Sequence, residues 1–107
     1  MPVRLVSDDL LFGSKVEGMI RQAGFEPVAQ ADADAQLVIV DLTDASTDPA
    51  SALAEARGEQ SVPALAYYAH TDDDVRRAAL DAGFDLVVPR SRMMREGVAL
   101  IQKLALP

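Results

Sequence analysis

A chain of 107 residues, half of them apolar and a quarter charged, is long enough for one globular domain with one core, which we assign to residues 1–107. The formal net charge of −7 argues against a nucleic-acid partner, because phosphate contacts need a basic face, and the absence of cysteine excludes disulfides and thiolate metal sites. No apolar run reaches the roughly 20 residues that span a bilayer, and the N-terminus lacks a signal-peptide pattern. We therefore expect a cytoplasmic protein with no membrane partner.

The first half of the chain predicts three strands and one helix. Residues 3–7 predict a buried strand, and residues 10–23 predict a helix, because their apolar side chains recur at intervals of three and four. Residues 25–30 predict a weaker strand, and Pro27 within it suits a strand at the edge of a sheet. The unbroken apolar run that ends in Asp41, residues 37–41, is typical of a strand buried on both faces of a parallel sheet.

The link between the second and third of these strands is short. Its middle part, residues 31–35, alternates alanine and aspartate and has too few residues for a normal crossover helix. Six extended residues reach about 20 Å, which is enough to cross a neighbouring strand. We therefore expect at most a single helical turn here.

The second half of the chain continues the alternation. We expect helices over 49–57, 72–82 and 92–104 and strands over 62–69 and 84–89. Asp48 and Pro49 begin the first of these helices, and Thr71 with the acids after it begins the second. The inner faces of the last two helices are expected to be Val75, Ala78, Ala79 and Ala82, and Met94, Val98, Ile101 and Ala105.

Five strands that alternate with helices predict an α/β fold with a parallel sheet, most simply a flavodoxin-like sheet of order 2-1-3-4-5 with its second helix reduced or absent. That order places the first and third strands side by side, so Asp8, Asp9 and Asp41 would share one crevice at their carboxyl ends. Three carboxylates without histidine or cysteine favour Mg²⁺, with the carbonyl of Thr43 as a further ligand. An aspartate at the end of a core strand is also common without any such role.

The order and spacing of these motifs resemble the receiver domains of response regulators. The segment 6–9 looks like the acidic pair of that family, the segment 38–41 looks like its phospho-acceptor strand, and segments 62–65 and 78–85 look like its fourth strand and the turn after its fourth helix. The resemblance covers nearly the whole chain. It implies a CheY-like fold, Asp8 and Asp9 as the metal pair, Asp41 as the phospho-acceptor, and a two-component phosphorelay.

Several positions depart from the family pattern. The family has a serine or threonine where this chain has Tyr68, a lysine where it has Arg90, and an aromatic residue where it has Val87. Arg90 keeps the charge but not the point-like geometry of lysine. We expect the ring of Tyr68 to line the mouth of the phosphoryl pocket and to impede phosphorylation.

Two functions follow from this mixture. In an atypical receiver, Asp41 bound to Mg²⁺ accepts a phosphoryl group from a kinase. In a pseudo-receiver, the chain is a protein-interaction module that works without phosphorylation. An independent enzyme is less well supported, because Asp44 stands three residues after Asp41 where a phosphatase motif needs two, and His70, the only histidine, has no nucleophile beside it.

A basic cluster on this acidic chain indicates where a partner could bind. Arg90, Arg92 and Arg95 lie close together in the sequence, beside Met93 and Met94. They are either a solvated helix edge or part of a face for a histidine kinase or a downstream effector. That face comprises the segments 72–82, 84–89 and 92–104, which are the fourth helix, fifth strand and fifth helix of the family, and a homodimer through it is left open.

Overall fold

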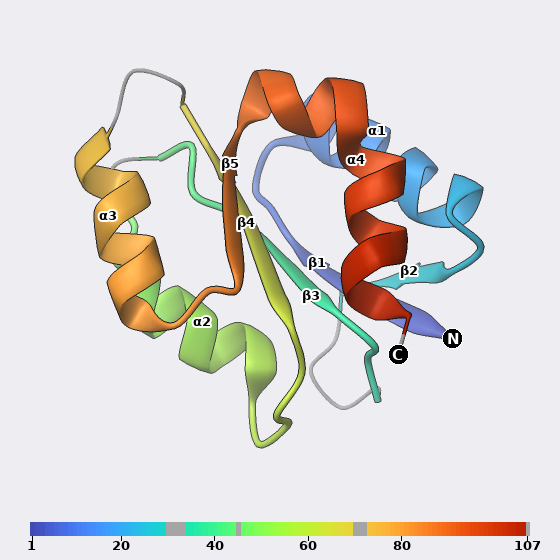
Figure 1. Ribbon diagram of the computed structural model, residues 1–107, viewed down its shortest axis with the longest axis horizontal. Helices are drawn as coiled ribbons and strands as arrows, with labels where there is room; N and C mark the ends of the chain where they lie inside the picture. Colours follow the sequence, from blue (N-terminus) through green and yellow to red (C-terminus); the bar gives the residue numbers. More distant parts are fainter. Residues whose placement is uncertain (30–33, 45, 70–72, 107) are drawn as a thin grey trace.

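One parallel sheet of five strands forms the centre of the molecule in the computed structural model, which describes residues 1–29, 34–44, 46–69 and 73–106. The strands are β1 (Pro2–Val6), β2 (Glu26–Val28), β3 (Val38–Asp41), β4 (Ala64–Tyr68) and β5 (Leu86–Pro89). Their order is β2-β1-β3-β4-β5, and all neighbouring pairs are parallel (Figure 1). The predicted fold class and strand order are therefore confirmed.

The helices of the described residues cover both faces of this sheet. Figure 1 shows α1 (Leu10–Gln22) and α4 (Arg90–Ala105) on one face, and α2 (Pro49–Arg57) and α3 (Asp73–Ala82) on the other. The start of β1 and the end of α4 lie near each other, at the end of the sheet opposite to the carboxyl ends of the strands. Within the described ranges, no helix combines the length and the apolar character that crossing a bilayer requires.

Two hydrophobic clusters lie on the two sides of the sheet because successive strand residues point to opposite faces. Ile39, Leu65 and Tyr67 pack toward α1 and α4, whereas Val40 and Tyr68 pack toward α2 and α3. The four-residue strand β3 is buried along its whole apolar run, as the unbroken pattern predicts.

Most helix ends fall where the sequence places them. Asp9 precedes α1, and Gly24 follows its end with φ of 98°, a left-handed conformation that glycine adopts without strain. Asp48 and Pro49 begin α2, and Gly58 ends it.

The link between β2 and β3 contains no helix in its described part, which is Ala29 and residues 34–37. Residues 30–33 lie outside the described residues, as do His70 and the expected cap Thr71. The strand β2 lies at the edge of the sheet and contains Pro27, as its sequence predicts.

The predicted inner faces of the last two helices are partly wrong. Met94 is 44% exposed, whereas Met93 is fully buried. The inward stripe of α4 runs through Met93, Gly97 and Ile101, and a side chain at position 97 would overlap the sulfur of Met19 on α1. Because Gly97 is buried but carries no apolar side chain, a pattern of apolar residues alone does not identify the buried face of this helix. In α3, Ala78 is also exposed.

Arg4 is the buried charged residue of β1, at 8% exposure, and the apolar pattern of the strand gives no reason for it. Its Nε donates to the carbonyl of Ala29 at 3.1 Å, and its Nη1 donates to the carbonyls of Glu55 at 2.7 Å and Ala56 at 2.6 Å. Both helix carbonyls belong to the last turn of α2, where the helix dipole favours a cation. The guanidinium therefore joins the end of β2 to the end of α2 beside the short link.

Replacing Arg4 by alanine should destabilise the fold, because it leaves carbonyl groups that have lost a charged donor. We expect the free energy of unfolding to fall by about 2 kcal/mol or more in Arg4→Ala. Arg4→Lys should recover only part of this loss, since an ammonium lacks the planar fork. Urea denaturation of the wild type and the two variants measures their free energies of unfolding. Equal values would show that the hydrogen bonds of Arg4 do not stabilise the fold.

Candidate functional site

Asp41 lies at the carboxyl end of β3, and the strand register determines its neighbours. Val6 of β1 pairs with Val40 of β3, so Ser7 comes to lie beside Asp41. Oδ2 of Asp41 accepts a hydrogen bond from the Ser7 hydroxyl at 2.8 Å. Oδ1 accepts from the amide of Thr43 at 2.9 Å and from its hydroxyl at 2.6 Å. Both oxygens of this half-buried carboxylate are therefore already hydrogen-bonded within the chain.

Asp9 serves as the N-cap of α1. Its Oδ1 accepts from the amides of Leu11 at 3.1 Å and Phe12 at 3.0 Å, two donors that have no partner inside the helix. Its own amide donates to the Ser7 hydroxyl at 3.2 Å. The other member of the predicted metal pair, Asp8, is exposed.

The predicted magnesium ligands are not gathered into a metal site in this arrangement. In the described ranges, no three side chains of histidine, cysteine, aspartate or glutamate lie so that they could hold a metal ion. The cause is local: Asp9 caps a helix and Asp41 is bonded to two hydroxyl groups. Magnesium binding by Asp8, Asp9, Asp41 and the Thr43 carbonyl stays a prediction.

An acidic hollow of about 300 Å³ opens between the end of β1, the end of β3 and the start of α2. Its polar lining among the described residues is Ser7, Asp8, Asp41, Thr47, Asp48, Ser51 and Glu55. The Ser51 hydroxyl and amide donate to Asp48 and hold the pKa of its carboxyl below the ordinary value, so this group is charged at neutral pH. Four carboxyl groups therefore surround an opening that contains no basic side chain in its described lining.

Arg90 and Tyr68, the other predicted site residues, lie away from this acidic hollow. The guanidinium carbon of Arg90 is 5.3 Å from the centroid of the Phe12 ring, a cation–π contact on the α1 side of the sheet. Tyr68 is 5% exposed and packs among the side chains under α2 and α3, with Val87 in the same cluster. Neither residue is in the described lining of the acidic hollow.

Tyr67 is the residue of this site that the sequence reasoning missed. It is fully buried and is paired with Asp41 in the register of β4 and β3. Its ring packs against Phe12 with centroids 5.0 Å apart. Its hydroxyl faces Ser7 and Asp41 but reaches hydrogen-bond geometry with no described residue. The sequence could have indicated Tyr67 through strand pairing, because the parallel neighbour of the strand that ends in Asp41 places one of its residues directly beside that aspartate.

The surroundings of Tyr67 keep its phenol neutral. Burial raises the pKa of the phenol well above its ordinary value, and the negative charges of Asp41 and Asp9 raise it further. The Ser7 hydroxyl acts in the opposite direction and is outweighed.

Comparison with known proteins gives matches at the level of structure. No protein-family model matches the sequence, and no curated protein matches it. The receiver domain of a sensor histidine kinase from Pseudomonas aeruginosa PAO1, solved with magnesium in its active-site cleft, superposes with a TM-score of 0.76 at 21% identity, over 97% of this chain and 96% of that one. The chain has the fold of response-regulator receiver domains.

Further receiver structures are similar to this chain. The receiver domain of the response regulator TorR matches at a TM-score of 0.79 and 17% identity, over 96% of this chain and 94% of that one. An atypical orphan response regulator, described as having a phosphorylation-independent regulatory mechanism, matches at 0.73 and 17% identity, over 98% and 95% of the two chains. At these identities the likeness establishes the receiver fold and leaves function to the residues of the site.

Substitution of Asp9 separates a capping role from an electrostatic one. Asparagine caps a helix as well as aspartate does, so Asp9→Asn should leave the free energy of unfolding nearly unchanged, whereas Asp9→Ala should lower it by about 1 kcal/mol. Thermal denaturation without added metal measures both. A clear gain of stability in Asp9→Asn would instead mean that repulsion among the carboxylates dominates.

Removing the phenol hydroxyl should not destabilise the protein. A buried donor without a partner costs about 1–3 kcal/mol, so Tyr67→Phe should be neutral or raise the free energy of unfolding. Below the ordinary pKa of 10.0 the phenol is neutral in both the folded and the unfolded state. Above this pH the phenol ionises in the unfolded state while it stays neutral in the folded state, so the wild type loses stability.

Tyr67→Phe should therefore lose less stability than the wild type as the pH rises from about 9 to about 11. Chemical denaturation across that range tests the prediction. A destabilised Tyr67→Phe protein at neutral pH would show that the hydroxyl has a hydrogen-bond partner in solution.

Proposed function

We propose that this chain is a receiver-like signalling domain that acts as a pseudo-receiver, a module that binds a protein partner without phosphorylation of Asp41. The observation that carries this proposal is the hydrogen bonding of both oxygens of the Asp41 carboxylate by Ser7 and Thr43. We propose no enzymatic activity of its own, and a cytoplasmic location stays a prediction.

A phospho-acceptor needs an oxygen that is free to attack phosphorus. Each hydrogen bond to an ionised carboxylate contributes about 1.5–3 kcal/mol, so freeing Asp41 from Ser7 or Thr43 would add to the barrier. An anionic phosphodonor would also approach an acidic hollow that contains four carboxyl groups. The basic residue at the family's lysine position, Arg90, is held on Phe12 and does not line that hollow.

The phosphorelay receiver is the second candidate. It is favoured by the position of Asp41 at the lining of an open hollow and by the magnesium in the cleft of a similarly folded receiver domain. In this alternative Asp41 would be the phospho-acceptor, and Asp8 and Asp9 would hold the Mg²⁺ ion. The hydrogen bonds that Asp9 makes to α1 would have to be given up or shared with the ion.

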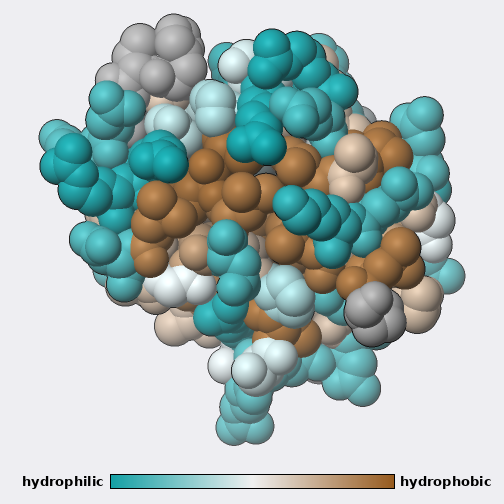
Figure 2. Space-filling model, viewed as in Figure 1, coloured by the Kyte–Doolittle hydropathy of each residue, from teal (hydrophilic) through white to brown (hydrophobic). Residues whose placement is uncertain are grey.

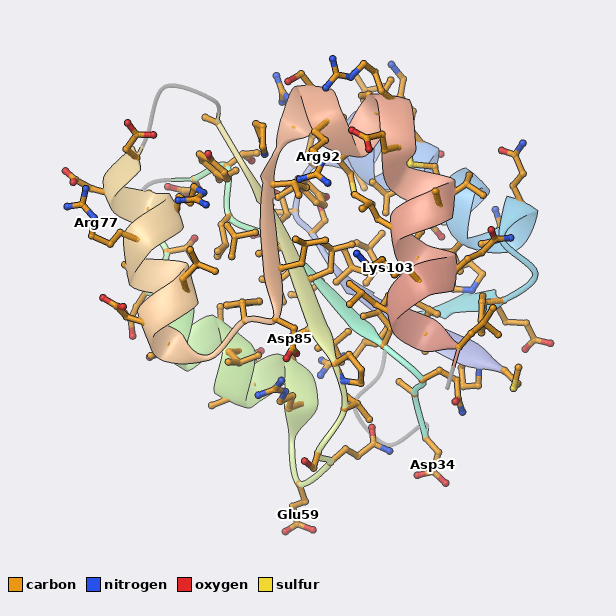
Figure 3. All side chains as sticks on the ribbon, in the orientation of Figure 1. Asp34, Glu59, Arg77, Asp85, Arg92 and Lys103 are labelled. Carbon is orange, nitrogen blue, oxygen red and sulfur yellow. The ribbon has the colours of Figure 1, made fainter. Side chains whose placement is uncertain are left out.

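For either function we propose a partner face formed by α3, β5 and α4, reached by a histidine kinase, a downstream effector or a second copy of the chain. Figure 2 shows apolar residues gathered along the strip over β5 between the two helices. Leu80 on α3 is 40% exposed to solvent. Figure 3 places Arg92 and Lys103 on the side of α4 that faces this strip.

Phosphorylation of Asp41 is the direct test of the two candidates. We expect acetyl phosphate with Mg²⁺ to give no phosphorylated protein by intact mass, and Mg²⁺ with beryllofluoride to leave the amide NMR signals near Asp41 unchanged. The double variant Ser7→Ala, Thr43→Val, which removes two of the three donors, should be labelled more readily. Asp41→Asn is the control for the site of modification. Efficient labelling of the wild type that Asp41→Asn abolishes would establish the phosphorelay receiver instead.

A further inference from the structure

A hollow of about 340 Å³ lies between β1, the first half of α1 and residues 27–29. The unequal lengths of two strands explain it, because β2 ends at Val28, which pairs with Arg4, whereas β1 continues to Val6. The first turns of α1 therefore cover a part of β1 that has no strand on its outer side within the described ranges. We call this opening the edge hollow, and Ser7 is the one described residue that it shares with the acidic hollow.

The sheet side of the edge hollow is apolar. Leu5 of β1 lines it together with Pro27 and Val28 of β2. Leu10 of α1 also belongs to the lining and is 88% exposed, so a ligand could bury it and gain about 1.5–3 kcal/mol for a full side chain. The volume of the edge hollow lies near the lower end of the roughly 300–1,000 Å³ that small-molecule pockets occupy.

The polar groups of the edge hollow are acceptors and hydroxyl groups. Asp9 and Glu17 contribute carboxylates, Ser7 and Ser14 contribute hydroxyls, and its described lining contains no basic side chain. Both capping hydrogen bonds of Asp9 go to Oδ1, which leaves Oδ2 without a donor from the described residues. Glu17 meets Arg21 only at 4.0 Å and at a solvent-exposed position, where ion pairs contribute little. Two carboxylates at this opening can therefore accept hydrogen bonds from a cation.

Gly13 keeps the space between α1 and β1 open. It is buried in the interior of a helix, where glycine destabilises by roughly 0.5–1 kcal/mol relative to alanine. A Cβ at this position would lie 3.5 Å from the Ser7 hydroxyl oxygen, which is an ordinary contact. Packing therefore does not demand glycine here, and a methyl group would fit while it narrows the edge hollow.

We propose that the edge hollow binds a small organic cation, an ammonium or amidinium group on a compact apolar body. The carboxylates of Asp9 and Glu17 bind the cation, and the apolar body packs on Leu5, Leu10 and Val28. Anionic ligands are disfavoured by these carboxylates and by the net charge of −7. The site goes beyond the signalling function proposed above, because it does not use Asp41 or the face over β5.

Three probes of nearly equal size and different charge test the ligand class on the full chain. Tryptamine is a cation, tryptophol is neutral and indole-3-acetate is an anion, and all three carry the same indole ring. Each is titrated into the ¹⁵N-labelled protein and followed by amide NMR shifts. We expect saturable shifts with tryptamine at Leu5, Gly13 and Val28, with a Kd below about 1 mM that rises with added salt. Tryptophol should bind at least about fivefold more weakly than tryptamine, and indole-3-acetate more weakly still.

Two glycine variants of the same helix test whether the open space is the binding site. Gly13→Ala should weaken tryptamine binding about tenfold because its methyl group enters the edge hollow. Gly18→Ala is the matched control, since a Cβ at this position of α1 meets nothing within 4 Å, and it should change the affinity less than about twofold. Both changes favour the helix, so a loss of binding cannot come from unfolding, which thermal denaturation checks.

Two further pairs of exposed residues test the apolar and the charged contact. Leu10→Ser should weaken tryptamine binding about fivefold, whereas Leu11→Ser, at 83% exposure but outside the described lining, should leave it within about twofold. Glu17→Gln should weaken binding about fivefold, whereas Glu96→Gln on α4, with a side chain of similar exposure, should not.

Three results would overturn the proposal. The first is no saturable binding of tryptamine, or equal affinities for tryptamine and tryptophol. The second is a Gly13→Ala affinity equal to that of the wild type. The third is binding that Glu55→Gln weakens and Glu17→Gln does not, which would place the cation in the acidic hollow. The labelling of Asp41 is measured separately, so failure here is distinguishable from failure of the pseudo-receiver proposal.

Discussion

The carboxylate of Asp41 has to be matched by donors at the edge of a buried sheet, because an ionised group that leaves water is costly unless it is hydrogen-bonded. Ser7 supplies a donor from the end of β1, and Thr43 supplies two from the turn after β3. The Ser7 bond joins the ends of two neighbouring strands, and the Thr43 bonds fix the turn after β3. The buried hydroxyl of Tyr67, on the next strand, has no hydrogen-bond partner among the described residues. The same groups that stabilise this edge therefore donate to both oxygens of the Asp41 carboxylate.

The fold was largely predictable because it depends on periodicity. Runs of apolar residues, glycines after helices and a proline in β2 are local signals that locate the elements. The order of the sheet follows from the rules for connections between parallel strands. The errors arose where packing depends on a residue that a hydrophobic pattern does not count. Gly97 lies in the buried stripe of α4 and Arg4 lies buried on β1, so the faces around them were assigned incorrectly or left unexplained.

The site was less predictable than the fold. Sequence reasoning placed Asp41 at the correct strand end, but it could not tell which donors the carboxylate would find, because that depends on side-chain rotamers and strand register. The same limit applies to Arg90, which follows β5 as expected and whose guanidinium lies over the ring of Phe12. Tyr67 was overlooked in favour of Tyr68, although alternation along a strand assigns the two rings to opposite sides of the sheet.

The position of the chain ends has a practical consequence for any larger assembly. The start of β1 and the end of α4 lie at one end of the sheet, whereas the first turns of α1 and α4 lie at the other end, where the strands have their carboxyl ends (Figure 1). The acidic hollow is lined by residues at the carboxyl ends of β1 and β3, so it opens at that same end. A fluorescent protein, an affinity tag or a neighbouring domain joined at either end, or at both, would leave these surfaces open to solvent. The fold can thus be carried on a tether or set between two other domains with its polar end still facing outward.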